Sequence, residues 1–281
     1  MKFRHHIVRA LDGPIGRTAL ARTATLWAKA LGQGDVEIYF RDGWWHRVGL
    51  MHFPTGPRFT YGRWSLSRLA NFEREMRARS AGYWFCHGTP RPGSVILDIG
   101  AGTGEDVLAF SDAVGPQGRV VAIEAHPQSF ALLSQMCRMN GLDNVALIHA
   151  PVMDKSGTVT ISDSGDLLAN SVTQRGELKV PAVTLDTLCA EQGVGAIDLV
   201  KMNIEGAELV ALSGAGEMLR RCRAICAAAH DFRADRGDGE AFRTSEFVSE
   251  LLASQGFRIE RRVADPRPWV RDHIWGLRGR D

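Results

Sequence analysis

The sequence predicts a mostly parallel α/β sheet with helices on both faces, preceded by a smaller region of mixed helix and antiparallel strand. From Val95 onward, short apolar runs typical of buried strands alternate with runs of helical periodicity. Strands separated by helices imply parallel pairing through right-handed crossovers. A turn with three glycines, Gly100, Gly102 and Gly104, follows the first strand. We therefore divide the chain into residues 1–93 and residues 94–281.

Two strand–helix units and a third strand open the second region. The predicted strands cover residues 95–100, 119–125 and 145–152. The predicted helices cover residues 105–113 and 127–140, and Pro127 opens the second of them. The segments "GTVTIS" and "ELKVPAVTL" then alternate with period two, which predicts a hairpin or a pair of edge strands.

The remainder returns to strand–helix alternation. The segment "AIDLVKMNIEGAE" predicts a buried strand followed by a helix that continues to about Leu219. Further strands are predicted over residues 224–230, 257–263 and 273–277, with a helix over 242–255. Ligands of such sheets bind beyond the carboxyl ends of the strands, so the strand ends are the positions where we expect a site.

Residues 1–93 do not fit this alternation, and we predict that they form a cap on the substrate side. They contain Trp44, Trp45, Trp64 and Trp84, and Leu66–Arg79 has the pattern of an amphipathic helix. These aromatic side chains either pack against the main sheet or form a wall over a small-molecule pocket.

Composition excludes several classes of function. The 281 residues are 44% hydrophobic and 23% charged with a net charge of +2, so we predict no nucleic-acid partner. No apolar run approaches the roughly 18 residues that span a bilayer, and the first residues lack the apolar stretch of a signal peptide. We therefore predict a cytoplasmic protein without a membrane partner. The five cysteines show no metal-like clustering and are interpreted as reduced thiols, with no metal site.

The glycine turn suits either a dinucleotide or S-adenosylmethionine. Its spacing is Gly-x-Gly-x-Gly, one residue short of the dinucleotide fingerprint. Asp98 lies within the preceding strand, and such a carboxylate must be hydrogen-bonded or paired. It either orients the turn formed by Gly100, Ala101 and Gly102, or attracts a cationic group. The latter favours S-adenosylmethionine, since a pyrophosphate would be repelled.

The next two strand ends complete the predicted cofactor site. The second strand ends at Glu124, whose carboxylate suits the two hydroxyls of an adenosine ribose in either cofactor. Ala125 and His126 follow it on the adenine side. The third strand ends in "HAPV", where Pro151 and Val152 offer an apolar face to adenine. Each residue also has a structural interpretation: Asp98 as a buried cap and Glu124 as a surface acid.

Several segments together resemble the FkbM-type methyltransferases. They are "VILDIGAGTGED", "VVAIEAHPQSF", "NSVTQ" following "ISDSGD", "TLDTL" and "IDLVKMNIEGAELVALSG", which span roughly residues 80–232. The resemblance implies a Rossmann-like class I methyltransferase fold and S-adenosylmethionine as methyl donor. It also implies O-methylation of a hydroxylated small molecule, such as a sugar or a polyketide-type natural product.

One position departs from the pattern of that family. The family usually has Asp where this chain has Asn203, in "KMNIEG". Asparagine keeps a carbonyl acceptor but loses the charge, so it cannot be a general base. The departure weakens a metal-dependent mechanism. We assign Asn203 to the cofactor site.

Three residues are candidates for catalysis. His230 ends the fifth strand, and an imidazole near its ordinary pKa accepts a proton at neutral pH. Asp231 is predicted to orient His230 or to replace it. Glu205 follows the fourth strand and either binds substrate hydroxyls or fixes the loop. Structural roles at a strand end and a helix start are the alternatives for His230 and Glu205.

Two other functions remain open from the sequence alone. A nicotinamide-dependent oxidoreductase would use the same fold, and a non-catalytic binding protein would explain Asn203. The predicted partner is a hydroxylated small molecule, and assembly into a homo-oligomer is left open.

Overall fold

The computed structural model is built around a seven-stranded sheet, and it describes residues 13–56, 58–161 and 178–279. The strand order is β11-β12-β10-β9-β4-β5-β6. The strands are β4 (Val95–Ile99), β5 (Arg119–Glu124), β6 (Val145–His149), β9 (Leu199–Met202), β10 (Ala224–Ala228), β11 (Arg258–Arg261) and β12 (His273–Leu277). The chain runs outward from β4 to β6 and then resumes on the other side of β4 with β9. The switch point therefore lies between β4 and β9, where such folds bind ligands.

Parallel pairing joins β6, β5, β4, β9 and β10. β12 is the one strand of this sheet that runs in the opposite direction, and it pairs antiparallel with β10 and β11. The predicted Rossmann-like α/β fold, a mostly parallel sheet with helices on both faces, is thereby confirmed. The predicted strands and helices recur with ends shifted by a few residues. The five cysteines are free thiols, and all but Cys86 are buried.

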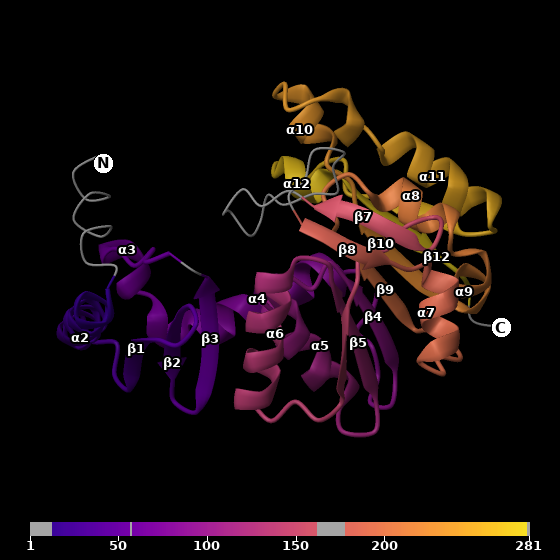
Figure 1. The fold of residues 1–281 in the computed structure, drawn as a ribbon. Coiled ribbons are helices and arrows are strands. Elements are labelled where there is room, and N and C mark those ends of the chain that lie inside the picture. Colours follow the sequence, from indigo (N-terminus) through magenta and orange to yellow (C-terminus); the bar gives the residue numbers. More distant parts are fainter. Residues whose placement is uncertain (1–12, 57, 162–177, 280–281) are drawn as a thin grey trace.

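Helices cover both faces of the sheet and give three layers (Figure 1). One face is covered by α4 (Phe72–Trp84), α5 (Glu105–Val114) and α6 (Pro127–Met139). The other is covered by α7 (Leu185–Glu191), α8 (Glu208–Ser213), α9 (Gly216–Arg221) and α11 (Ser245–Ser254). Three short helices complete this part of the fold: α10 (Asp231–Asp235), η2 (Glu240–Phe242) and α12 (Pro268–Arg271).

The predicted hairpin forms as a separate two-stranded antiparallel sheet of β7 (Gly157–Ile161) and β8 (Leu178–Ala182). The predicted strand over 145–152 ends early, at His149, and Val152 instead forms a parallel bridge with Val183. The predicted helix up to Leu219 is broken into α8 and α9. The break lies at Gly214, where a Cβ would come within 2.7 Å of the Met153 carbonyl oxygen, so the chain there packs backbone against backbone.

The N-terminal region is mixed helix and antiparallel strand, as predicted. It comprises α2 (Pro14–Ala30), β1 (Val36–Phe40), β2 (Trp44–Val48), β3 (Met51–Gly56), α3 (Arg63–Leu66) and η1 (Leu69–Asn71), and α4 follows it. The predicted single helix over Leu66–Arg79 is interrupted between α3 and α4. Figure 1 shows α2 and β1–β3 beyond α6, on the side away from α7 and α9.

The aromatic side chains of this region are mostly core residues. Trp45 and Phe53 belong to the same buried cluster as Leu132 and Met136 of α6, so the small sheet is anchored on α6. Trp44 packs within the N-terminal region, and Trp84 packs against the main sheet. Only Trp64 of the four is exposed. A cap over the substrate side stays a prediction.

No helix among the described residues is long and apolar enough to cross a membrane.

Candidate functional site

The glycine turn after β4 lies at the switch point of the sheet. The backbone N–H groups of Gly100 and Ala101 both donate to the Ile123 carbonyl, at 2.9 and 3.0 Å, and so tie the turn to β5. A Cβ on Gly100 would lie 2.0 Å from the Asn203 carbonyl oxygen, so a side chain is excluded there. Gly102 has a φ of +59° and open space where its Cβ would be. The turn therefore leaves room for a ligand to approach its backbone.

Asp98 is held by a residue that the sequence analysis did not single out. It is 0% exposed and its Oδ1 lies 2.7 Å from Nζ of Lys201, which is 2% exposed and sits in register with it on β9. Lys201 also donates to the Gly100 carbonyl at 2.6 Å. Burial lowers the pKa of Lys201, but the carboxylates of Asp98 and Asp106 outweigh this and raise it, so the lysine keeps its charge.

This pair bears on the two roles expected of Asp98. Orienting the turn fits, because Lys201 links the Asp98 carboxylate to the Gly100 carbonyl. Lys201 already neutralises the carboxylate, which leaves little charge to attract a cationic ligand. A lysine flanked by apolar residues in a predicted buried strand requires a buried counter-charge. This pattern around Lys201 could have indicated from the sequence that an acid lies opposite it.

Glu124, at the end of β5, reaches across to the glycine turn. Its Oε2 accepts from the Gly102 N–H and its Oε1 from the His126 N–H, both at 2.8 Å. Burial raises the pKa of Glu124, although these two backbone N–H groups oppose the shift. The structure thus brings Glu124 together with the glycine turn and with Asn203, whose carbonyl packs on Gly100.

The residues predicted for the adenine side lie in two different places: Ala125 and His126 precede α6, whereas Pro151 and Val152 pack into the core. His126 is buried and precedes Pro127 at the start of α6, and the Ala125 carbonyl lies 3.2 Å from Nε2 of His149. Val152 belongs to the core cluster that includes Leu185. An apolar face for adenine from Val152 therefore does not fit, because this side chain is buried in the core. Pro151 is buried beside it, with its carbonyl bonded to the Val183 N–H.

A second cluster lies at the ends of β9 and β10. His230 is buried, with Nε2 3.2 Å from Oε1 of Glu205 and Nδ1 3.4 Å from Oε1 of Glu208. Arg233 of α10 approaches the other oxygen of Glu205 at 2.7 Å. Glu205 has a φ of +55°, a strained conformation for a residue with a side chain, and such strain gathers at functional sites.

The charges of this cluster correct the expectation for His230. Burial lowers its pKa, but the carboxylates of Glu205 and Glu208 outweigh burial and raise it to about 9. The imidazole is therefore protonated at neutral pH and is not placed to accept a proton. Burial raises the pKa of Glu205, but His230 and Arg233 outweigh it and hold the pKa below its usual range, so Glu205 is ionised.

Asp231 has a structural position instead of the expected catalytic one. Its Oδ1 accepts from the N–H groups of Thr244 and Ser245, and its Oδ2 from the Ser245 hydroxyl. Its carboxylate thus satisfies backbone donors at the start of α11. Glu208 and Arg233 were missed because they lie in α8 and α10, just beyond the strand ends at which the sequence analysis expected a site.

The family of the chain follows from comparison with known proteins. The family model described as "Methyltransferase FkbM domain" matches residues 98–259, more than half of the chain. The chain belongs to the FkbM methyltransferase family. This confirms the predicted family and the predicted methyl donor, S-adenosylmethionine.

Two relatives matched by sequence agree with this assignment. The chain is 30% identical over 157 residues to the 2-O-methyltransferase NoeI of Sinorhizobium fredii, which covers 48% of the chain and 63% of NoeI. It is 26% identical over 212 residues to the 31-O-demethyl-FK506 methyltransferase FkbM of Streptomyces tacrolimicus, which covers 63% of the chain and 76% of that protein. The chain thus spans less than two thirds of NoeI. A solved FkbM methyltransferase of Methylobacillus flagellatus is 16% identical with a TM-score of 0.46, covering 77% of this chain and 56% of its own.

The strand-end residues fit that donor. Oδ1 of Asn203 is a buried acceptor with no hydrogen-bond partner within the described residues, which suits the ammonium of a methionine moiety. Glu124 suits the ribose hydroxyls, and the open space at Gly102 lies beside its carboxylate. Within the same described residues, no group of three or more His, Cys, Asp or Glu side chains is placed to hold a metal ion.

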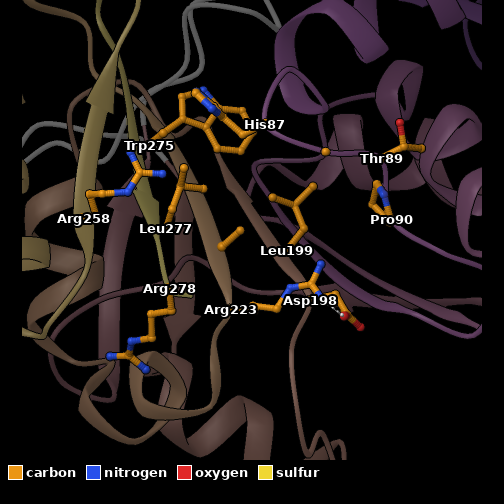
Figure 2. A pocket seen from close by; sticks show the side chains of 12 residues that line it. His87, Thr89, Pro90, Asp198, Leu199, Arg223, Arg258, Trp275, Leu277 and Arg278 are labelled. Carbon is orange, nitrogen blue, oxygen red and sulfur yellow. Dashed lines mark ion pairs between the residues drawn. The ribbon is translucent and has the colours of Figure 1, made fainter. Parts of the chain in front are cut away.

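A cavity of about 220 Å³ lies at the opposite edge of the sheet, at the amino ends of β9 and β10 (Figure 2). Three arginines line it, but their charges do not converge on it. Arg278 donates to the carbonyls of Leu219, Arg220 and Gln255, while Arg223 is next to Asp198 and Arg258 contacts Glu260. We therefore do not assign a ligand to this cavity.

Replacing Lys201 tests the buried pair. We expect Lys201→Met to lower the free energy of unfolding by about 3–5 kcal/mol at neutral pH, because it leaves the Asp98 carboxylate buried without a counter-charge. The double variant Asp98→Asn, Lys201→Met should recover most of this loss. Urea denaturation monitored by circular dichroism measures both. If the double variant lost as much free energy of unfolding as Lys201→Met and Asp98→Asn lose together, the result would argue against the pair.

The pH dependence of stability tests the charge of His230. Its pKa of about 9 in the folded chain exceeds the ordinary value of about 6.5, so its contribution is complete below pH 6.5 and lost as pH rises through 9. The shift corresponds to about 3 kcal/mol. We expect the free energy of unfolding of the unmodified chain to fall by this amount across the window relative to His230→Gln. Parallel stability curves for the two proteins would show that His230 is not held as a cation.

Proposed function

We propose that the chain catalyses S-adenosylmethionine-dependent O-methylation of a small hydroxylated molecule, of the sugar or polyketide-alcohol class. The observation that carries the proposal is the buried Glu124 carboxylate, which reaches the open glycine turn at the switch point. The printed names of NoeI and FkbM, both O-methyltransferases, support oxygen as the accepting atom. The family match sets aside the nicotinamide-dependent alternative. Methyl transfer in a turnover assay would exclude a non-catalytic binding protein.

When bound, S-adenosylmethionine supplies a methyl group activated by a positively charged sulfur. The chain then has to position the accepting hydroxyl in line and remove its proton. Glu205 is the group we assign to the hydroxyl, because its carboxylate is ionised and stands at the end of β9, beside the switch point. The hydroxyl donates to Glu205 and becomes strongly acidic as its oxygen gains the methyl group. A carboxylate of low pKa can therefore accept the proton late in the reaction.

His230 and Arg233 act through Glu205 in this account. The imidazolium holds one carboxylate oxygen and the guanidinium approaches the other, so together they fix the direction in which Glu205 points. Glu208 holds the opposite nitrogen of His230 and also accepts from the Ile204 N–H, which ties the histidine to the loop before α8. His230 and Glu208 are thus positioning residues for the Glu205 carboxylate.

Binding of S-adenosylhomocysteine tests the role of Glu124. We expect Glu124→Ala to weaken binding on the order of 10- to 100-fold, because two hydroxyl bonds to a charged acceptor are lost. Isothermal titration calorimetry measures the affinity, and Glu246→Ala, an exposed acid on α11, is the matched control. Unchanged affinity in Glu124→Ala, or binding of NAD in place of S-adenosylhomocysteine, would refute the assignment.

Methyl transfer from a labelled donor to a mixed pool of monosaccharides and macrolide alcohols tests Glu205. We expect Glu205→Gln to lower kcat on the order of 10²- to 10⁴-fold, since proton transfer by a positioned group contributes that much. The affinity for S-adenosylhomocysteine should stay nearly unchanged. His230→Gln should lower kcat less. If Glu205→Gln kept the full rate, the hydroxyl would have to be held by another residue, and a lack of any turnover in the unmodified chain would favour a binding protein.

A further inference from the structure

The helix α2 exposes three of its large apolar side chains, while its fully buried residues are all alanines. Its fully buried residues are Ala21, Ala24 and Ala28, and they contact the N-terminal core together with the half-buried Leu20. Ile15 is 88% exposed, Leu26 68% and Trp27 50%. In an ordinary surface helix the large apolar residues face the core. The opposite arrangement in α2 indicates that its outward face is built for contact with something else.

These exposed residues form a continuous surface along the helix. Ile15 and Leu26 are eleven positions apart, which is close to three full turns, so they lie on the same line of the helix, and Trp27 flanks it. Arg22 and Lys29 lie on the other flank and are exposed. We call Ile15, Leu26, Trp27, Arg22 and Lys29 the α2 surface.

Charge is separated between the two regions of the protein. Residues 1–93 carry 15 Lys and Arg against 6 Asp and Glu, a net charge of +9, whereas residues 94–281 carry 19 against 26, a net charge of −7. The overall charge of +2 hides this difference. A basic region beside an acidic one directs the α2 surface toward an anionic partner and turns the acidic domain away from it.

We propose that the α2 surface docks the protein on anionic lipid membranes as a peripheral contact, with the apolar stripe entering the headgroup boundary. Exposed Leu, Ile and Trp beside Arg and Lys on one helix is the arrangement that binds such a surface. A second copy of the chain is disfavoured, because a two-fold contact would bring the +9 regions and the Arg22 side chains together. Nucleic acid is disfavoured, because aliphatic side chains give phosphates nothing to bind. The prediction of no membrane partner considered only spanning segments and a signal peptide.

The position of α2 agrees with this use. In Figure 1 it lies at the end of the molecule farthest from α7 and α9, beyond β1–β3. Helix α3 packs against α2, and Trp64 of α3 is also exposed. The guanidinium of Arg68 lies over the Trp64 ring.

Co-sedimentation of the full chain with vesicles tests the proposal. We expect binding to phosphatidylcholine vesicles that contain phosphatidylglycerol, little binding to phosphatidylcholine alone, and weaker binding at high salt. Leu26→Gln should weaken binding on the order of tenfold. The joint change of Arg22→Gln and Lys29→Gln should weaken it several-fold. Phe247→Gln, which replaces an exposed apolar residue on α11, should leave binding unchanged.

Other outcomes would overturn the proposal. They are no preference for anionic vesicles, an equal loss in Phe247→Gln, a dimer in sedimentation velocity that Leu26→Gln abolishes, or oligonucleotide binding that competes with the vesicles. Leu26→Gln should keep its melting temperature and its affinity for S-adenosylhomocysteine. Failure of the lipid contact is therefore distinguishable from failure of the proposed methyl transfer.

Discussion

The ion pair between Asp98 and Lys201 is the constraint on which the donor site depends. It joins β4 to β9 at the switch point, in an environment where neither side chain is accessible to water. Because Lys201 also holds the Gly100 carbonyl, the pair fixes the start of the glycine turn, and the close approach of Gly100 to Asn203 fixes its other side. Glu124 then reaches the same turn from β5. Residues of β4, β5 and β9 thus hold the glycine turn in place.

The cluster on the neighbouring strands follows a different physical logic. Asp98 is fully buried with a single lysine, whereas Glu205 is partly exposed and stays ionised between two cationic side chains. A buried imidazolium and a guanidinium hold a carboxylate that stays ionised and strained at the end of β9. The buried Glu208 and the partly buried Glu205 keep His230 protonated, so the proton-accepting role moves from the histidine to Glu205. In this account the reaction depends mainly on how firmly Glu205 is positioned.

Most of the fold could be predicted because apolar periodicity and glycine placement report directly on buried strands and turns. The strand end at Glu124 was accurate for that reason. The charge state of His230 could not be predicted, because it depends on Glu205 and Glu208 meeting the ring in three dimensions. The true partner of Asp98 was missed because strand register, which a single sequence does not give, brings Lys201 opposite it. Likewise, the N-terminal charge is visible in the sequence, but the outward turn of Leu26 is not.

A crystal structure of the chain with S-adenosylhomocysteine at neutral pH tests the central claim most directly. The account predicts that Lys201 still bridges Asp98 and the Gly100 carbonyl, with the ligand's ribose on Glu124 and its amino-acid end at Asn203. A ligand ammonium bound directly to Asp98, with Lys201 displaced from the pair, would contradict it.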